Sequence, residues 1–233
     1  MQVVILAAGK GVRMGKLTNN IPKPLLKISG RPIVEYTLLN LPEEISEIIF
    51  VIGYKGEMIK KYFGEKFNGK KISYVEQKEL NGTGGAIFSL KNLIYNRFLV
   101  LNGDDIYHVD DLAKLLSHKI ALLVKQIENN DRFGTVEVDK QGYLKSIVEF
   151  RNLKDKNAAS NLVNTGAYVL NKEIFDYPQV PISEKEFGLP QTLAQMTDKH
   201  KIKVIKANVW HPNGQEEDLI KGEEVVRKYF NKF

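Results

Sequence analysis

Residues 6–15 have the sequence LAAGKGVRMG, which contains the residue types that suit a phosphate-binding loop. Alanine and glycine let backbone N–H groups approach a ligand closely, and Lys10 and Arg13 add positive charge beside them. The apolar run before it, residues 3–8, predicts a buried strand that ends at the first glycine. The composition therefore predicts contact with a phosphate chain, and an ordinary strand-to-helix turn is the alternative.

Two familiar phosphate-binding loops do not fit this spacing. A P-loop places four residues between its first glycine and a Gly-Lys pair that Ser or Thr follows. Here only three residues lie between Gly11 and the Gly15-Lys16 pair, and Leu17 stands where the hydroxyl residue belongs. The dinucleotide motif G-x-G-x-x-G runs straight into a helix, which Pro22 and Pro24 prevent. The spacing therefore disfavours a dinucleotide oxidoreductase.

Lys23 lies between Pro22 and Pro24, a short distance after this loop. Both proline rings fix φ, so we expect the lysine on a stiff, extended segment close to the loop. A lysine that only faces solvent needs no such support, whereas one aimed at a phosphate benefits from it. Lys23 is therefore a second candidate phosphate contact.

Asp104 follows a short apolar strand, residues 98–101, in the sequence Asn-Gly-Asp. A carboxylate at a strand end, beside Gly103, suits Mg²⁺ held against phosphate oxygens. The alternative is an ordinary turn, because Asn, Gly and Asp are typical turn residues. Asp105 is the weaker candidate ligand, since its side chain should point to the opposite face.

Gln77 follows another expected strand, residues 71–76, and its amide offers the paired donor and acceptor that can read a nucleobase edge. Gly82 and Thr83, at the start of the next expected helix, add backbone N–H groups near a base or ribose. The alternative for Gln77 is a solvated surface residue.

These segments are positioned by an alternation of strands and helices. We expect strands at residues 3–8, 47–53, 71–76, 98–101 and 120–127, and helices at residues 32–39, 57–63, 83–93 and 110–117. This order predicts a Rossmann-like α/β fold, with a mostly parallel sheet and helices on both faces. Ligands of such sheets bind at the carboxyl ends of the strands, where all the candidate residues lie.

The second half has a different pattern. Short strands at residues 133–138, 143–149 and 162–170 predict a smaller antiparallel or mixed layer that caps the parallel half. A helix at 187–199, a strand at 202–207 and an amphipathic helix at 215–233 complete the chain. We expect one domain over residues 1–233, divided into residues 1–127 and 128–233.

The composition excludes several classes of protein. The 233 residues include no cysteine, which removes disulfides and thiol chemistry. The net charge is +6, but the basic residues are spread out, so we expect polyanionic small substrates and no nucleic acid. The six apolar residues after Gln2 are too few for a signal peptide or a membrane span. We therefore expect a cytoplasmic protein with no membrane partner.

The motifs together resemble one family. LAAG-x-G-x-RM at residues 6–14, PKPLL at 22–26, GTGGA at 82–86 after Gln77, and NGD at 102–104 are similar to motifs of the sugar-1-phosphate nucleotidylyltransferases. FGTVEV at 133–138, IVE at 147–149 and VNTGAYV at 163–169 extend the resemblance over nearly the whole chain.

The resemblance implies an enzyme that joins a nucleoside triphosphate and a sugar 1-phosphate, giving an NDP-sugar and pyrophosphate with Mg²⁺ as cofactor. Residues 1–127 would bind the nucleotide and residues 128–233 the sugar phosphate. The implied nucleotide contacts are Leu6, Ala7, Ala8, Gly9, Lys10, Gly11, Arg13, Lys23, Gln77, Gly82, Thr83 and Gly103. The implied sugar-phosphate contacts are Gly134, Glu149, Arg151, Asn164 and Thr165. Arg13 and Lys23 would act in catalysis, and Asp104 would hold the metal.

The chain departs from the family pattern at two places. Where the family has a lysine for the sugar phosphate, this sequence has Phe150, and Arg151 comes one position late. Where the family has its second metal-binding aspartate, this sequence has Pro212, which cannot bind a metal. The neighbouring Asn213 offers an oxygen, whereas Asp218 is better suited to cap the last helix. The resemblance is to the nucleotidyltransferase part alone, without the β-helix acetyltransferase domain of some relatives.

These departures leave alternatives open. One is a cytidylyltransferase or molybdopterin-type nucleotidyltransferase on the same fold, such as one acting on phosphocholine. Another is a non-catalytic nucleotide-sugar sensor. The sequence does not choose among UTP, GTP and dTTP, does not identify the sugar, and does not decide between a monomer and an oligomer.

Overall fold

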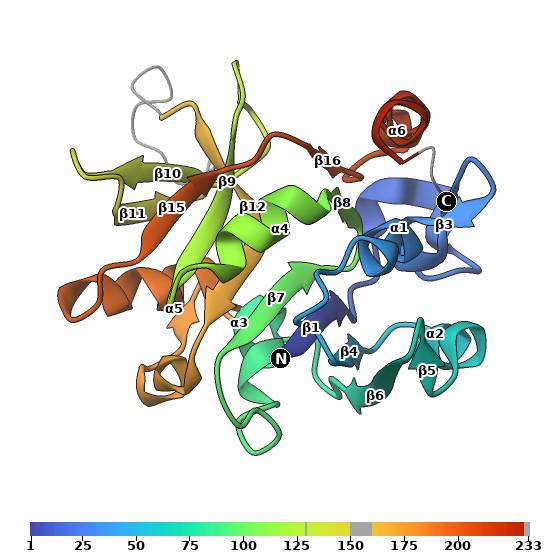
Figure 1. The fold of residues 1–233 in the computed structure, drawn as a ribbon. Coiled ribbons are helices and arrows are strands. Elements are labelled where there is room, and N and C mark those ends of the chain that lie inside the picture. The colour runs from blue at the N-terminus through green and yellow to red at the C-terminus, as the bar shows by residue number, and fades with distance from the viewer. Residues whose placement is uncertain (129, 150–159, 231–233) are drawn as a thin grey trace.

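The computed structural model describes residues 1–128, 130–149 and 160–230. Its centre is a ten-stranded mixed sheet (Figure 1). Four parallel strands form the first half in the order β7 (Phe98–Asn102), β1 (Gln2–Ala7), β4 (Glu47–Ile52) and β6 (Lys70–Glu76). The short strand β5 (Lys66–Phe67) pairs antiparallel with β6 at the edge. The expected parallel sheet is thus confirmed.

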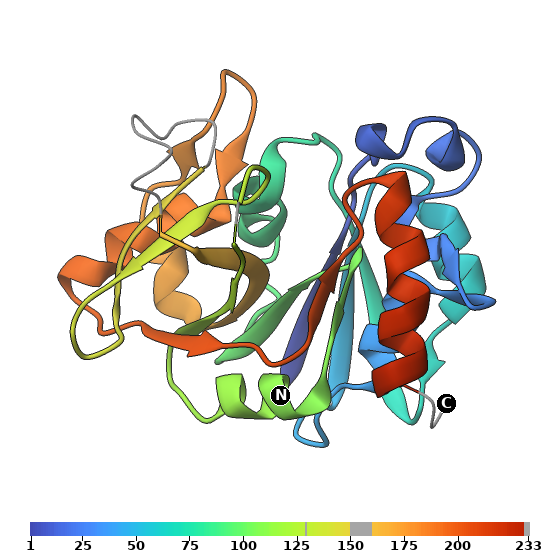
Figure 2. The same cartoon turned by 90° about the horizontal axis from the view of Figure 1, so that it is seen from above.

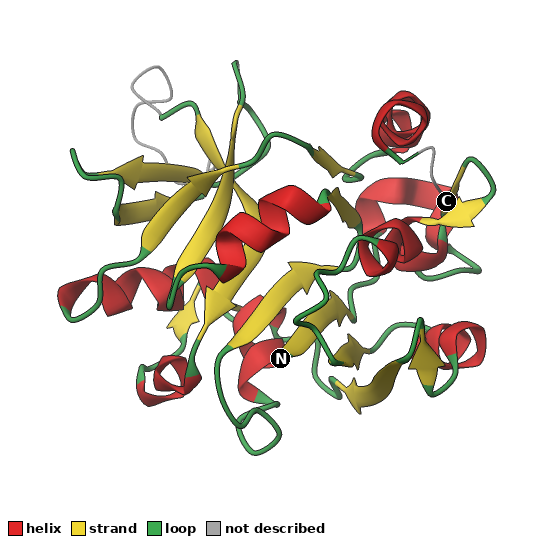
Figure 3. Cartoon of the chain, in the orientation of Figure 1, coloured by secondary structure: helices red, strands yellow, loops and turns green. Residues whose placement is uncertain are grey.

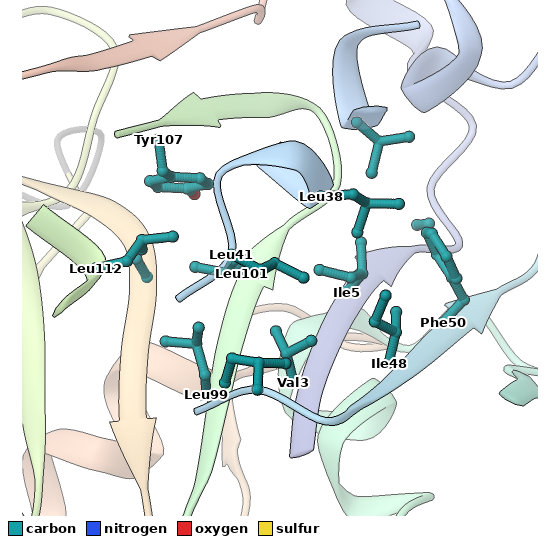
Figure 4. Close-up of a cluster of buried hydrophobic side chains, with 14 of the residues drawn as sticks. Val3, Ile5, Leu38, Leu41, Ile48, Phe50, Leu99, Leu101, Tyr107 and Leu112 are labelled. Atoms are coloured by element: carbon teal, nitrogen blue, oxygen red, sulfur yellow. The ribbon is translucent and has the colours of Figure 1, made fainter. Parts of the chain in front are cut away.

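Helices cover both faces of this sheet, because successive strand side chains point to opposite faces. Val3 and Ile5 lie in one core, against α1 (Ile33–Leu39), α2 (Gly56–Phe63) and α4 (Val109–Leu116) (Figure 4). Val4, between them in sequence, lies in the other core, which α3 (Gly82–Phe88) and α5 (Leu189–Gln195) cover. The result is the expected three-layer α/β arrangement (Figure 3).

The second half is a set of mixed strands joined to the edge of the parallel half. The long strand β12 (Leu162–Leu170) runs antiparallel to β7 and also pairs with β10 (Thr135–Val138). Strand β10 in turn pairs antiparallel with β11 (Leu144–Val148). The pairing is antiparallel, as expected, but these strands continue the central sheet through β12 and do not form a separate layer that caps it.

Strand β9 (Ala121–Gln126) differs from the expected continuation of the parallel sheet. It pairs antiparallel with β12 and parallel with β15 (Lys203–Lys206), and not with β7. Strand β12 occupies the position beside β7, and a register shift between Asn164 and Tyr168 separates its two sets of β9 pairs. The alternation of elements in the sequence does not reveal this insertion, because the partner strands lie far along the chain.

The last helix, α6 (Glu216–Tyr229), packs against the segment that follows β1 (Figure 2). This segment contains the 3₁₀ turns η1 (Val12–Thr18) and η2 (Lys23–Leu25) and the small hairpin of β2 (Lys27–Ile28) and β3 (Arg31–Pro32). Met14 is buried with Val226 and Phe230 in a third core. The C-terminal helix therefore packs against the segment that follows β1 and stabilises it.

Several element boundaries differ from expectation. The expected helix at 83–93 ends as α3 at Phe88. The expected helix at 187–199 is β14 (Phe187–Gly188), which pairs with β13 (Val180–Pro181), followed by α5 and η5 (Met196–Asp198). Turn η4 (Lys172–Asp176) follows β12.

The backbone at Lys23 also differs from the expected extended segment, because Lys23 begins the 3₁₀ turn η2. The turn is closed by the N–H groups of Leu25 and Leu26, which donate to Pro22 and Lys23 carbonyls at 2.9 and 3.0 Å. Pro24 lies at a position whose missing N–H costs the turn nothing. Over the residues that the structure describes, no helix is long and apolar enough to cross a membrane.

Candidate active site

A cavity of about 630 Å³ opens at the carboxyl ends of β1, β6 and β7. It brings together most of the expected nucleotide contacts and the expected metal ligand: Leu6, Ala7, Ala8, Gly9, Lys10, Gly11, Arg13, Lys23, Gln77, Gly82, Thr83 and Asp104. Gly103 lies behind this wall, where a Cβ would come within 2.9 Å of the Leu6 carbonyl oxygen. The cavity therefore joins three segments that are far apart in sequence.

The loop after β1 is shaped by Gly11. Its φ of 65° is left-handed, and a Cβ there would lie 3.0 Å from Thr18 and 3.1 Å from the Lys23 Cβ. Only glycine leaves room for Lys23 to pack against the loop. Lys10 and Arg13 are exposed and line the cavity, so the loop presents two cations to whatever enters.

Lys23 and Asp104 form an ion pair at the floor of the cavity. Only 8% of the Lys23 side chain is exposed, against 30% for Asp104, so the lysine is enclosed and the carboxylate is open to a ligand. Residues from η2 and from the turn after β7 are thereby brought into contact. Such a pair can bind a cation through the carboxylate and an anion through the ammonium group.

Asp105 is buried directly behind Asp104 and begins the short strand β8 (Asp105–Tyr107), which pairs with β16 (Trp210–Pro212). Its Oδ2 accepts hydrogen bonds from Asn102 and Trp210, both at 3.3 Å, and from Tyr107 at 3.4 Å. Burial, with the charge of Asp104, raises the pKa of Asp105 to about 7, although Lys23, Asn102 and Trp210 partly offset the shift. The side chain points away from the cavity, as expected.

We expect Asp105→Asn to remove a pH dependence of stability. The pKa of Asp105 is raised on folding, so the folded state holds this proton more tightly and stability falls as pH rises from about 4 to 7. In EDTA at pH 8.5, the free energy of unfolding of the variant should exceed that of the wild type by roughly 1–4 kcal/mol, and its melting temperature should be higher. Near pH 4 the two proteins should be equally stable. Exposed Asp198→Asn is the control. Parallel pH curves for Asp105→Asn and the wild type would contradict the assignment.

The expected sugar-phosphate contacts form a second group, outside the cavity wall. The Asn164 N–H donates to the Gly134 carbonyl at 2.9 Å, and a Cβ at Gly134 would lie 3.5 Å from Glu149 Oε1. The Thr165 hydroxyl is buried and donates to the Leu123 carbonyl at 2.8 Å, so it faces the sheet. Arg151 and Phe150 lie outside the described residues.

The two groups meet where β12 crosses β7. A Cβ at Gly166 would lie 2.0 Å from Asn102 Nδ2, and Asn102 lines the cavity. Glycine at position 166, with φ of 75°, therefore allows β12 to approach the end of β7 closely. Gly134, Glu149 and Asn164 are positioned from that strand and its neighbours.

Asn213 and Asp218 follow β16 and lie close to Gly214, which lines the cavity, but neither is itself part of the cavity wall. The Asn213 Nδ2 donates to the Asp104 carbonyl at 3.0 Å, while its buried Oδ1 has no hydrogen-bond partner among the described residues. Asp218 caps α6 by accepting the Gln215 N–H at 2.8 Å, as its sequence position suggested. Arg132 pairs with Asp218 through two bonds of 3.1 and 2.6 Å, which hold the pKa of Asp218 below its usual value despite burial.

Sequence reasoning missed several cavity-lining residues. Glu186, on the hairpin of β13 and β14, and Gly214, before α6, come from segments with no phosphate-like signal. The apolar side chains of Val51, Leu80 and Ala86 form another part of the wall. They lie next to predicted segments, and only the topology places them in the cavity.

The sequence pattern of the nucleotidyl transferase family matches residues 2–228 of this chain. The chain belongs to the nucleotidyl transferase family. A D-glycero-alpha-D-manno-heptose 1-phosphate guanylyltransferase of Campylobacter jejuni is 40% identical over 178 residues, covering 76% of this chain and 78% of that protein. The resemblance inferred from the motifs is thus confirmed.

Other members of the nucleotidyl transferase family extend the comparison. The bifunctional protein GlmU of Methanocaldococcus jannaschii is 36% identical over 99% of this chain and 55% of that protein. The chain therefore spans about half the length of the GlmU relatives that it matches. The solved UDP-glucose pyrophosphorylase from Acinetobacter baumanii shares the fold, with a TM-score of 0.83 and 21% identity over 97% of this chain and 92% of that one.

Proposed function

We propose that this protein joins a nucleoside triphosphate and a sugar 1-phosphate to form an NDP-sugar and pyrophosphate. The observation that carries the proposal is the Lys23–Asp104 pair at the floor of a cavity that also contains Lys10, Arg13 and Gly11. Two anionic substrates must approach each other in this reaction, so cations that neutralise and align them supply most of the catalysis. The site combines these cations with a carboxylate for a metal.

The chemical step is an in-line displacement at the α-phosphorus. A sugar-phosphate oxygen forms the new P–O bond as the bond to the pyrophosphate oxygen breaks, and that oxygen leaves with the bonding electrons. Lys23 neutralises the phosphate that carries the reacting phosphorus, and Arg13 holds the pyrophosphate. No proton transfer is needed, because the sugar phosphate is already ionised.

Asp104, which lines the cavity, and Asn213, which is hydrogen-bonded to the Asp104 carbonyl behind it, fit a bound Mg²⁺. Asp104 offers a partly exposed carboxylate, and Asn213 offers a buried amide oxygen without a hydrogen bond from any described residue. Mg²⁺ prefers oxygen ligands and usually keeps several waters, so one carboxylate and one amide suffice. No cluster of three acidic, His or Cys side chains occurs in the described ranges, so a metal here would have fewer than three such ligands from them. When bound, Mg²⁺ would stabilise the charge that develops on the phosphate oxygens.

We assign nucleotide binding to residues 1–127 and sugar-phosphate binding to residues 128–233, within one domain that acts in the cytoplasm. UTP, GTP and dTTP are the candidate nucleotides. The relatives support this range, because they include the guanylyltransferase above and a Haloferax volcanii UTP--glucose-1-phosphate uridylyltransferase, 31% identical over 75% of this chain and 74% of that protein. Gly134, Glu149 and Asn164 would contact the sugar, with Thr165 supporting their strand.

We expect purified protein to release pyrophosphate from at least one pairing of UTP, GTP or dTTP with a sugar 1-phosphate, and only when Mg²⁺ is present. A coupled pyrophosphate assay over a matrix of nucleotides and sugar phosphates measures this, with EDTA as the control. Phosphocholine and CTP belong in the matrix, because turnover with that pair alone would favour the cytidylyltransferase alternative. Nucleotide binding without any pyrophosphate release would indicate a sensor and contradict the proposal.

A further inference from the structure

Gln77 is held at the cavity by the sheet itself. Its backbone N–H donates to the Ile52 carbonyl at 2.8 Å, which continues the β4–β6 ladder one residue past the end of β6. The residue is only 7% exposed, yet it lines the cavity. Because the position of Gln77 is fixed, the orientation of its amide decides what hydrogen bond it offers to a ligand.

Both hydrogens of this amide are used inside the protein. Nε2 donates to Oδ1 of Asn81 at 2.9 Å and to the Gly82 carbonyl at 3.0 Å. A primary amide has two N–H donors, and a backbone carbonyl can only accept, so the nitrogen must face Gly82. Among the described residues no donor reaches Oε1, and this oxygen is not enclosed. The amide therefore presents only an acceptor to a ligand.

Asn81 is itself firmly placed. Its side chain lies over the first turn of α3, where a Cβ at Gly85 would come within 1.8 Å of Asn81 Oδ1. Its backbone carbonyl accepts the N–H of Phe187 from β14 at 2.8 Å. Asn81 is absent from the cavity wall, so it acts on a ligand only through Gln77.

We propose that Asn81 is a positioning residue that locks the Gln77 amide with its carbonyl oxygen toward the cavity, so that the site takes nucleotides whose base carries a ring N–H. The inference rests on the proposed nucleotidyl transfer. Uracil, thymine and guanine have such an N–H, whereas the corresponding ring nitrogen of cytosine or adenine is an acceptor. Two acceptors facing each other leave both without a partner, which is the main source of selectivity in polar pockets.

Loss of Asn81 should relax this selectivity. Without Oδ1, the Gly82 carbonyl alone holds the amide nitrogen. The amide can then turn about its last side-chain torsion at the cost of one hydrogen bond instead of two, and it can offer an N–H to the ring nitrogen of cytosine or adenine. The apolar wall of Val51, Leu80 and Ala86 remains, so bases still find a surface to pack against. The preference for bases with a ring N–H over cytosine and adenine should therefore fall, while nucleotides in general still bind.

Isothermal titration of UTP, GTP, dTTP, CTP and ATP with Mg²⁺, without sugar phosphate, tests the proposal. We expect the wild type to bind the best of the first three roughly 10- to 100-fold tighter than CTP or ATP, the effect of one unpaired polar group. Asn81→Ala should bring this ratio to about threefold or less, mainly by tighter CTP binding. Asn81→Asp keeps an oxygen acceptor for Gln77 and should preserve the ratio even if all affinities fall.

The control is Asn92→Ala, an exposed asparagine beyond α3 that should leave every affinity unchanged. Wild-type protein that binds CTP or ATP as tightly as UTP, GTP and dTTP would overturn the proposal. An Asn81→Ala variant that keeps the wild-type ratio of affinities would also overturn it. Pyrophosphate release, measured in parallel, separates the two hypotheses. Selective binding without turnover refutes only the enzyme, turnover without selectivity refutes only the role of Asn81, and no nucleotide binding refutes both.

Discussion

Asp104→Asn should lower the rate of pyrophosphate release by about 10²–10³-fold while the protein keeps its fold. The variant has nearly the same shape, and its amide oxygen can still accept from Lys23, so the enclosed ammonium group keeps a partner. What it loses is the negative charge that holds a divalent cation against phosphate oxygens, and one charge-stabilising group is worth about 10²–10³ in rate. The Asn213 bond is to the Asp104 backbone carbonyl and survives the change.

Steady-state rates and the melting temperature of Asp104→Asn separate a lost metal ligand from a lost structure. Asp110→Asn is the matched control, because it removes the same charge from a side chain that is 73% exposed on the first turn of α4. Electron paramagnetic resonance with Mn²⁺ and nucleotide should show binding in the control and much weaker binding in Asp104→Asn. Activity within tenfold of the wild type would exclude Asp104 as a metal ligand.

The parallel half of the fold could be predicted because its signals are local. The apolar runs at β1, β4 and β7 and the glycines that end them lie within each segment. The carboxyl-end rule for parallel sheets then places Gly11, Gln77 and Asp104 at one edge, and the cavity contains all three. For this part of the site, strand order was not needed.

The rest depended on contacts between distant segments. Asp105 was expected only to point away from the metal site, and no local pattern indicates that it begins a strand whose partner is Pro212, far along the chain. Glu186 reaches the cavity because the backbone N–H of the next residue, Phe187, donates a hydrogen bond to the Asn81 carbonyl just before α3. The orientation of the Gln77 amide depends on two acceptors in a loop, and periodicity carries no information about such a geometry.

Lys23→Met should have two opposite effects, a loss of turnover and a gain in metal binding. Turnover should fall by about 10²–10³, since one cation that neutralises the reacting phosphates is removed. In the nucleotide-free protein, however, the ammonium group of Lys23 is paired with the Asp104 carboxylate that a metal must use. Methionine keeps the apolar part of the enclosed side chain and leaves the carboxylate unpaired, so Mn²⁺ should bind about 3- to 10-fold more tightly, the value of one such ion pair.

Titration of Mn²⁺ into nucleotide-free protein, followed by the resonance of the free ion, measures this second effect. Lys27→Met is the matched control, because Lys27 is exposed, lies four residues further along the chain and changes the net charge equally. If both variants tighten Mn²⁺ binding alike, the gain comes from overall charge and not from the pair. If Lys23→Met alone does so, the nucleotide-free protein keeps its metal ligand occupied by its own lysine. Entry of a triphosphate, which draws Lys23 to its phosphates, would then release Asp104, and metal and nucleotide would bind cooperatively.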